Sequence, residues 1–138
     1  MAQKNIETLQ KLGEAWNRDD LDGFLKTLHP EIEFHSEVAR RVESAETFVG
    51  HAGMRRFWEE WRAVWDLTID ISNYHDLGDT VVSVGHMRIH GKGSGVDFES
   101  PVAYVNEFED GLIRRVRAYL DPKQGLEAAG LSAQNARG

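Results

Sequence analysis

Apolar residues recur three or four positions apart in three stretches of the chain, a spacing typical of amphipathic helices. Residues 5–16 predict a first helix, and residues 21–28 predict a second helix that Asp20 caps and His29-Pro30 ends. A third helix is predicted after residues 50–53, with an unusually aromatic stripe formed by Met54, Phe57, Trp58, Trp61, Val64 and Trp65. That stripe suits either simple packing against a sheet or the wall of an apolar cavity.

Alternation of apolar and polar residues predicts five strands, because successive side chains of a strand point to opposite faces. They cover residues 31–38, 67–77, 80–90, 96–108 and 112–120. Asp110-Gly111 between the last two strands is a strong hairpin signal, and the glycine-rich residues 91–95 join the preceding pair. Residues 40–50 predict a loop, and Asp121-Pro122 predicts a short terminal helix. Helices on one face of a curved antiparallel sheet give an α+β fold, a cone with an interior.

Composition and charge narrow the function classes. The 138 residues suit a single domain covering residues 1–138. A formal net charge of −7 without a long basic run disfavours nucleic acid and anionic membranes as partners. The absence of cysteine excludes disulfides and thiolate metal sites, and neither a signal peptide nor an apolar run of the ~20 residues that span a bilayer is evident. We therefore expect a soluble, cytoplasmic protein with no cofactor.

The predicted strand over residues 80–90 places three polar side chains, His86, Arg88 and His90, on one face. If that face lines the interior, His90 is a candidate general base and Arg88 a candidate anchor for an anionic group. If that end of the strand is open to water, the three side chains are simply solvated. His86 and His90 lie roughly 13 Å apart on a strand, at about 3.3 Å per residue, so one metal ion cannot join them and no metal site is predicted.

Five strings, in order along nearly the whole chain, resemble the nuclear transport factor 2-like (NTF2-like) superfamily, specifically its SnoaL-like and ketosteroid isomerase-like branch. They are residues 15–23 (AWNRDDLDG), 28–34 (LHPEIEF), 50–57 (GHAGMRRF), 91–96 (GKGSGV) and 116–121 (VRAYLD). The resemblance implies a cone-shaped, cystatin-like fold, in which the curved sheet packs on the N-terminal helices around an enclosed, mostly apolar pocket. It also implies a homodimer formed through the outer face of the sheet.

The catalytic acids of the known relatives are not matched in this chain. Where steroid isomerases of this branch carry a basic aspartate and an oxyanion hole made of a tyrosine and a protonated aspartate, the aligned residues are Ser36, Leu12 and Tyr104. Where epoxide hydrolases and SnoaL-type cyclases carry acidic residues, this chain has His90 and Ala118. The resemblance therefore leaves open whether the protein is an enzyme.

The resemblance also implies which residues face the pocket. If the protein is an enzyme, we expect His90 as base, Arg88 as anion stabiliser and Tyr104 as hydrogen-bond donor. The expected ligand-binding residues are Trp16, Phe34, Ser36, Trp61, His86 and Asn106. The predicted function is binding of a small hydrophobic molecule with a carboxylate, enol or carbonyl oxygen, with isomerisation or cyclisation by proton transfer as its chemistry. The alternative is a non-catalytic homodimeric scaffold whose own aromatic residues fill the cavity.

Overall fold

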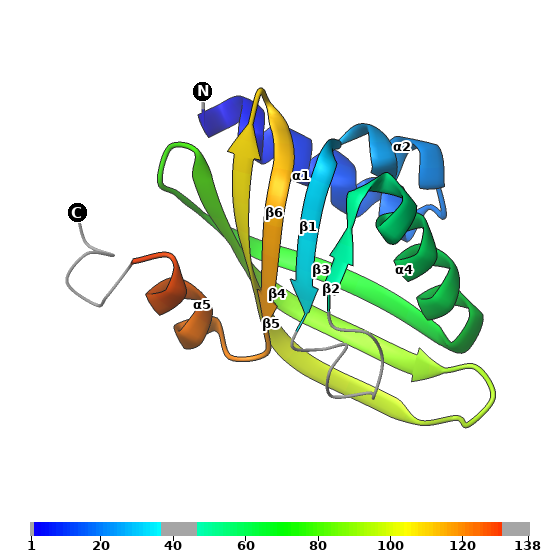
Figure 1. Cartoon of the computed structure of the whole chain (residues 1–138). Coiled ribbons are helices and arrows are strands. Elements are labelled where there is room, and N and C mark those ends of the chain that lie inside the picture. The colour runs from blue at the N-terminus through cyan, green and yellow to red at the C-terminus, as the bar shows by residue number, and fades with distance from the viewer. Residues whose placement is uncertain (1, 37–46, 131–138) are drawn as a thin grey trace.

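The computed structural model describes residues 2–36 and 47–130, and its elements follow the predicted order with one addition, the short strand β2. The predicted loop over residues 40–50 lies largely outside the described residues. No described helix has the length and apolar character needed to cross a membrane. The elements, labelled in Figure 1, are α1 (Ala2–Asn17), α2 (Leu21–Lys26), β1 (Leu28–Ser36), β2 (Thr47–Val49), α4 (Gly50–Val64), β3 (Trp65–Asp76), β4 (Thr80–Gly91), β5 (Asp97–Glu109), β6 (Leu112–Tyr119) and α5 (Pro122–Ala128).

The strands form one sheet in the order β2-β1-β6-β5-β4-β3. Neighbouring strands are antiparallel except β1 and β6, which run parallel. Figure 1 shows the sheet strongly curved, with α1, α2 and α4 on one side and α5 apart from them. We call the side covered by α1, α2 and α4 the inner face and the opposite side the outer face. The α+β cone predicted from the sequence is confirmed.

Local chemistry sets several element boundaries as predicted. The Asp20 carboxylate accepts a hydrogen bond from the Gly23 N–H at 3.0 Å and caps α2, and Asp121 caps α5 in the same way. Asp110 and Gly111 have φ angles of 54° and 78°, the positive pair that a tight hairpin turn between β5 and β6 requires. The second helix is shorter than predicted, because α2 ends at Lys26 and β1 already begins at Leu28.

The core lies between the inner face and the helices. Its buried aromatic residues are Trp16, Phe24, Phe34, Phe48, Phe57, Trp58, Trp61 and Phe108. The Arg62 guanidinium stacks over Trp16 and Trp58, with its carbon 4.6 Å and 4.2 Å from the two ring centroids. The Trp16 indole N–H donates to the Leu67 carbonyl at 2.7 Å. Trp16 is therefore held on two sides, which fixes one end of α1 against both α4 and β3.

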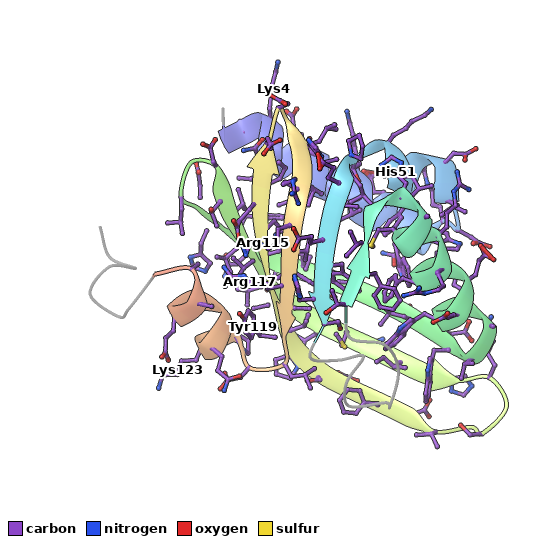
Figure 2. The ribbon with its side chains drawn as sticks, viewed as in Figure 1. Lys4, His51, Arg115, Arg117, Tyr119 and Lys123 are labelled. Atoms are coloured by element: carbon purple, nitrogen blue, oxygen red, sulfur yellow. The ribbon has the colours of Figure 1, made fainter. Side chains whose placement is uncertain are left out.

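Helix α5 covers part of the outer face. Its residue Leu126, with Ala129 just beyond its end, packs on a small cluster formed by Val82, Ala103 and Val105. The rest of the outer face carries charged side chains, and Figure 2 shows Arg115 and Arg117 among those along β6, on the side where α5 lies. The outer face is thus apolar under α5 and polar elsewhere.

Candidate functional site

A cavity of about 100 Å³ lies between α1 and the inner face of the sheet. A volume of this order takes roughly one aromatic ring. Its lining is almost wholly apolar and comes from both helices and strands. The described lining residues are Leu9, Leu12, Gly13, Trp16, Phe24, Leu28, Ile32, Phe34, Met54, Phe57, Leu67, Ile69, Ile71, Tyr74, Ser83, Tyr104, Asn106 and Val116. None of these residues carries a charge at neutral pH.

Three polar side chains, Asn106, Tyr104 and Ser83, lie together on one side of this mostly apolar cavity. We call them the polar wall, and the side chain of Asn106 organises it. The Asn106 amide nitrogen lies 2.9 Å from the Val81 carbonyl, 3.1 Å from the Tyr104 carbonyl and 3.0 Å from the Ser83 hydroxyl. Two carbonyls can only accept, so this end of the side chain must be the NH₂ group. The Asn106 carbonyl oxygen has no hydrogen-bond partner among the described residues, although the residue is only 1% exposed. Because Asn106 borders the cavity, this oxygen can accept a hydrogen bond from a donor placed there.

Tyr104 and Ser83 are directly opposite each other in the pairing of β4 with β5. Asn106 lies two residues after Tyr104 on the same face of β5, so the three side chains are neighbours. The Tyr104 hydroxyl has no hydrogen-bond partner among the described residues. Burial raises the pKa of Tyr104 above its ordinary value, so the hydroxyl keeps its proton and can donate at neutral pH. Burial also raises the pKa of Tyr74, which lines the cavity from β3. The polar wall therefore offers neutral donors and one amide acceptor.

Four of the residues expected from the sequence line this cavity: Trp16, Phe34, Tyr104 and Asn106. Ser36 and Trp61 are buried, at 5% and 3% exposure, but neither belongs to the described lining. Ligand contact by the four lining residues stays a prediction, since their position alone has been established.

The expectation that His86, Arg88 and His90 face the cavity is wrong. All three point outward from β4 into solvent, and the Arg88 side chain is 78% exposed. Two of them meet acids of the neighbouring strand, with Arg88 Nε 3.8 Å from Glu99 and His90 Nδ1 2.5 Å from Asp97. The physical reason is the alternation itself, since the apolar side chains between them occupy the core and force the polar ones outward. His90 and Arg88 cannot act as base and anion stabiliser in this cavity.

Comparisons with known proteins identify the family to which this fold belongs. Residues 9–116 match the family model of the SnoaL-like domain. The chain belongs to the SnoaL-like family. No curated protein sequence matches this SnoaL-like chain with significance.

Solved structures share the fold of this SnoaL-like domain. An NTF2-like protein of unknown function from Burkholderia pseudomallei is 20% identical, with 90% of this chain and 95% of that one covered and a TM-score of 0.77. TerC, co-crystallised with polyporic acid, is 20% identical, with 98% and 99% covered and a TM-score of 0.76. A protein with a ketosteroid isomerase-like fold from Catenulispora acidiphila, in complex with trimethylamine, is 18% identical, with 93% and 95% covered and a TM-score of 0.72. These likenesses establish the fold.

A second cluster in the SnoaL-like domain brings together His29, Glu109 and Asp110 at the β5–β6 turn. The His29 Nδ1 atom accepts a hydrogen bond from the Glu31 N–H at 3.0 Å. In the neutral ring the proton then sits on Nε2, which lies 3.1 Å from the Glu109 carboxylate. Because a metal would need the lone pair of Nε2, this arrangement fits a hydrogen bond and does not fit a metal ligand.

Sequence reasoning missed Ser83, Tyr74 and Gly13 of the SnoaL-like cavity. Ser83 shares its strand face with the buried Met87, so the alternation in β4 contained the signal. Tyr74 reaches the cavity only because the pairing of β3 with β4 shifts by one residue between Ile71 and Asn73. No pattern in the sequence indicates that shift.

Proposed function

We propose that this SnoaL-like domain binds a small, uncharged, mostly apolar molecule that carries one hydroxyl or similar neutral polar group. The observation that carries the proposal is the pair of unpartnered polar groups in an apolar cavity, the Asn106 carbonyl oxygen and the Tyr104 hydroxyl. A ligand hydroxyl would donate to Asn106 and accept from Tyr104, which satisfies both groups at once. A polar ligand group placed elsewhere in the cavity would lose its water without gaining a partner.

Arg88 points outward, so it cannot bind an anionic group of a ligand in this cavity. The described lining offers an anion no positive charge, and burying an unpaired charge is strongly unfavourable. The same lining offers no group that is a base at neutral pH, which proton-transfer chemistry requires. Isomerisation or cyclisation therefore has one supporting feature among the described residues, the donor Tyr104, whereas binding is supported by the whole lining.

The cavity also bears on the scaffold alternative. Aromatic residues pack against one another around Phe57, with ring centroids 4.9–5.6 Å from those of four neighbours, Trp16, Phe34, Phe48 and Trp61. Even so, they leave a hollow next to the polar wall. A scaffold that needed only stability would gain by filling this space, because cavities are costly. The hollow favours ligand binding over a purely structural role.

Three probes of nearly equal shape test the proposal by calorimetric titration. The neutral 4-ethylphenol should bind, whereas 4-ethylbenzoate should bind at least about tenfold more weakly because its charge is unpaired. Ethylbenzene fills the cavity but leaves Asn106 and Tyr104 unpartnered, so its affinity should be lower than that of 4-ethylphenol. Tyr104→Phe should weaken 4-ethylphenol binding by about tenfold, the effect of one lost hydrogen bond. Equal affinity for all three probes, or no binding at all, would overturn the proposal.

We also propose that two copies pair through the outer face, in the cytoplasm. The pairing of β3, β4 and β5 places Asp66 and Asp97 on either side of His90, and Asp70 and Glu99 beside His86 and Arg88, respectively. The basic side chains of β4 thus form a row between acidic side chains of β3 and β5. In a dimer with a two-fold axis, the basic row of one copy can face an acidic row of the other. A chain without cysteine needs no oxidising compartment for disulfides, which is compatible with the cytoplasm.

A further inference from the structure

Helix α1 lines the cavity with one apolar stripe that is interrupted by a glycine. Leu9, Leu12, Gly13 and Trp16 occupy positions i, i+3, i+4 and i+7 of the helix, and all four border the hollow. A large apolar side chain would suit each position, yet Gly13 has none. A Cβ atom placed on Gly13 would meet no atom within 4 Å. Glycine is also a poor helix former, so local stability does not explain its place inside a 16-residue helix, four residues before the last one.

The exposure of the lining residues locates the mouth of the cavity. The lining residues of β3 are partly exposed, and so are Leu12 and Gly13 on α1. Lining residues from the other side, such as Phe34 on β1 and Met54 on α4, are buried at 8% and 4% exposure. Strand β3 is an edge strand, with a sheet neighbour on one side only. The cavity therefore opens between α1 and β3, and Gly13 lies at this opening.

We infer that Gly13 is the entrance residue of the cavity, where the missing side chain keeps a passage between α1 and β3 open to the ligand. The inference rests on the proposed function, since an entrance matters only if a molecule enters. The side of the passage next to Gly13 is rigid, because Trp16 on the following turn is fixed by its hydrogen bond to Leu67 and by Arg62. The side chain at position 13 thus sets the width of the passage, and with it the size and entry rate of the ligand.

The experiment is stopped-flow binding of 4-ethylphenol, followed by tryptophan fluorescence, which Trp16 in the cavity wall makes sensitive to the ligand. The variants are Gly13→Ala, Gly13→Val and Gly13→Leu, which add successively larger side chains at the entrance. Association and dissociation should slow together along this series, reaching about tenfold in Gly13→Leu, because a narrowed passage obstructs both directions. Gln10→Leu adds the same side chain at an exposed position of α1 and should leave both rates unchanged.

Three other results overturn the inference, and they are distinguishable. If the wild type binds 4-ethylphenol but the association rate is the same in all Gly13 variants, Gly13 is no entrance and the proposed function stands. If the wild type binds none of the probes, the proposed function fails and the inference fails with it. Faster dissociation with unchanged association would mean that position 13 only adds bulk inside the cavity. Should Gly13→Leu fail to fold, the alanine and valine variants decide the matter, since the Cβ atom that both add meets no atom within 4 Å.

Discussion

Asn106 has two separate tasks, one at each end of its amide. Its nitrogen joins β4 to β5 by bonding to Val81, Ser83 and Tyr104, and its oxygen is left for the cavity. The first task is structural and the second is available for ligand binding. Tyr104 divides in a similar way, since its backbone carbonyl takes part in the network while its hydroxyl remains unpartnered among the described residues.

The raised pKa of Tyr104 predicts a loss of stability in alkaline solution. Below the ordinary tyrosine pKa of 10.0 the phenol is protonated in both the folded and the unfolded chain. Above it the unfolded chain loses the proton first, so the free energy of unfolding falls as pH rises, by up to about 1.4 kcal/mol per pH unit. In Tyr104→Phe this decline should be shallower, with stability near neutral pH little changed. Urea unfolding at neutral and alkaline pH measures both.

A second variant separates the contributions of the two cavity tyrosines. Tyr74→Phe should also make the alkaline decline shallower, because burial raises the pKa of Tyr74 in the same direction. An identical decline in the wild type and in Tyr104→Phe would contradict the prediction for Tyr104.

The expected strand residues that lie in the cavity wall are those where side-chain type and strand alternation agree, and their contact with a ligand stays a prediction. Phe34, Tyr104 and Asn106 share their strand faces with buried neighbours, and all three line the cavity. His90 and Arg88 were assigned to the cavity from the family resemblance, against an alternation that placed apolar residues on the opposite face. The hydrophobic effect decided the outcome, because burying the methionine and isoleucine between them excludes the charged face from the core.

At the level of elements, the fold depends on an irregularity in β3. The register of β3 against β4 shifts between Ile71 and Asn73, so Tyr74 turns to the cavity face. The same irregularity brings the backbone of β3 very close to β4 at Gly85. A Cβ atom on Gly85 would lie only 2.1 Å from the Asp70 carbonyl oxygen and 2.7 Å from the Ile71 Cα atom. Only glycine fits there without moving one of the two strands.

Gly85→Ala should therefore lower the free energy of unfolding by about 1–3 kcal/mol, the usual cost of forcing atoms into a packed region. The midpoint of urea unfolding measures the effect. Gly93→Ala is the matched control, because a Cβ atom at Gly93 meets nothing within 4 Å and should change stability by no more than about 0.5 kcal/mol. Equal unfolding midpoints for the two variants would show that β3 yields to the extra methyl group.

The long elements were predictable, whereas strand β2 and the parallel pairing of β1 with β6 were not. Periodicity over ten or more residues identified α1, α4 and the strands β3 to β5, since each buries one regular face. Strand β2 escaped prediction because three residues, Thr47–Val49, are too few to show alternation. The parallel pairing of β1 with β6 escaped it as well, because a local pattern does not say which distant strand becomes a neighbour.

At the scale of the whole molecule, the proposed pairing of two copies predicts a charge-dependent assembly. Arg88→Glu places a carboxylate beside Glu99 on the outer face and should raise the dimer dissociation constant about tenfold, or ~1.4 kcal/mol. Sedimentation over a range of concentrations measures the constant. Arg55→Glu makes the same charge change at an exposed position on α4 and should leave the assembly unaffected. A wild type that stays monomeric at every concentration would contradict the proposal.

The parallel pair of β1 and β6 has a consequence for how the chain folds. Ser36 pairs with Ala118, so the first strand finds its central neighbour only after almost all the other elements have been synthesised. Until then α1, α2 and β1 expose aromatic residues for which no sheet face exists. Contacts between such distant segments slow folding, because a long loop must close before any of them forms. We therefore expect the domain to fold late and as one unit after leaving the ribosome, with its nascent N-terminal half as the natural substrate of chaperones.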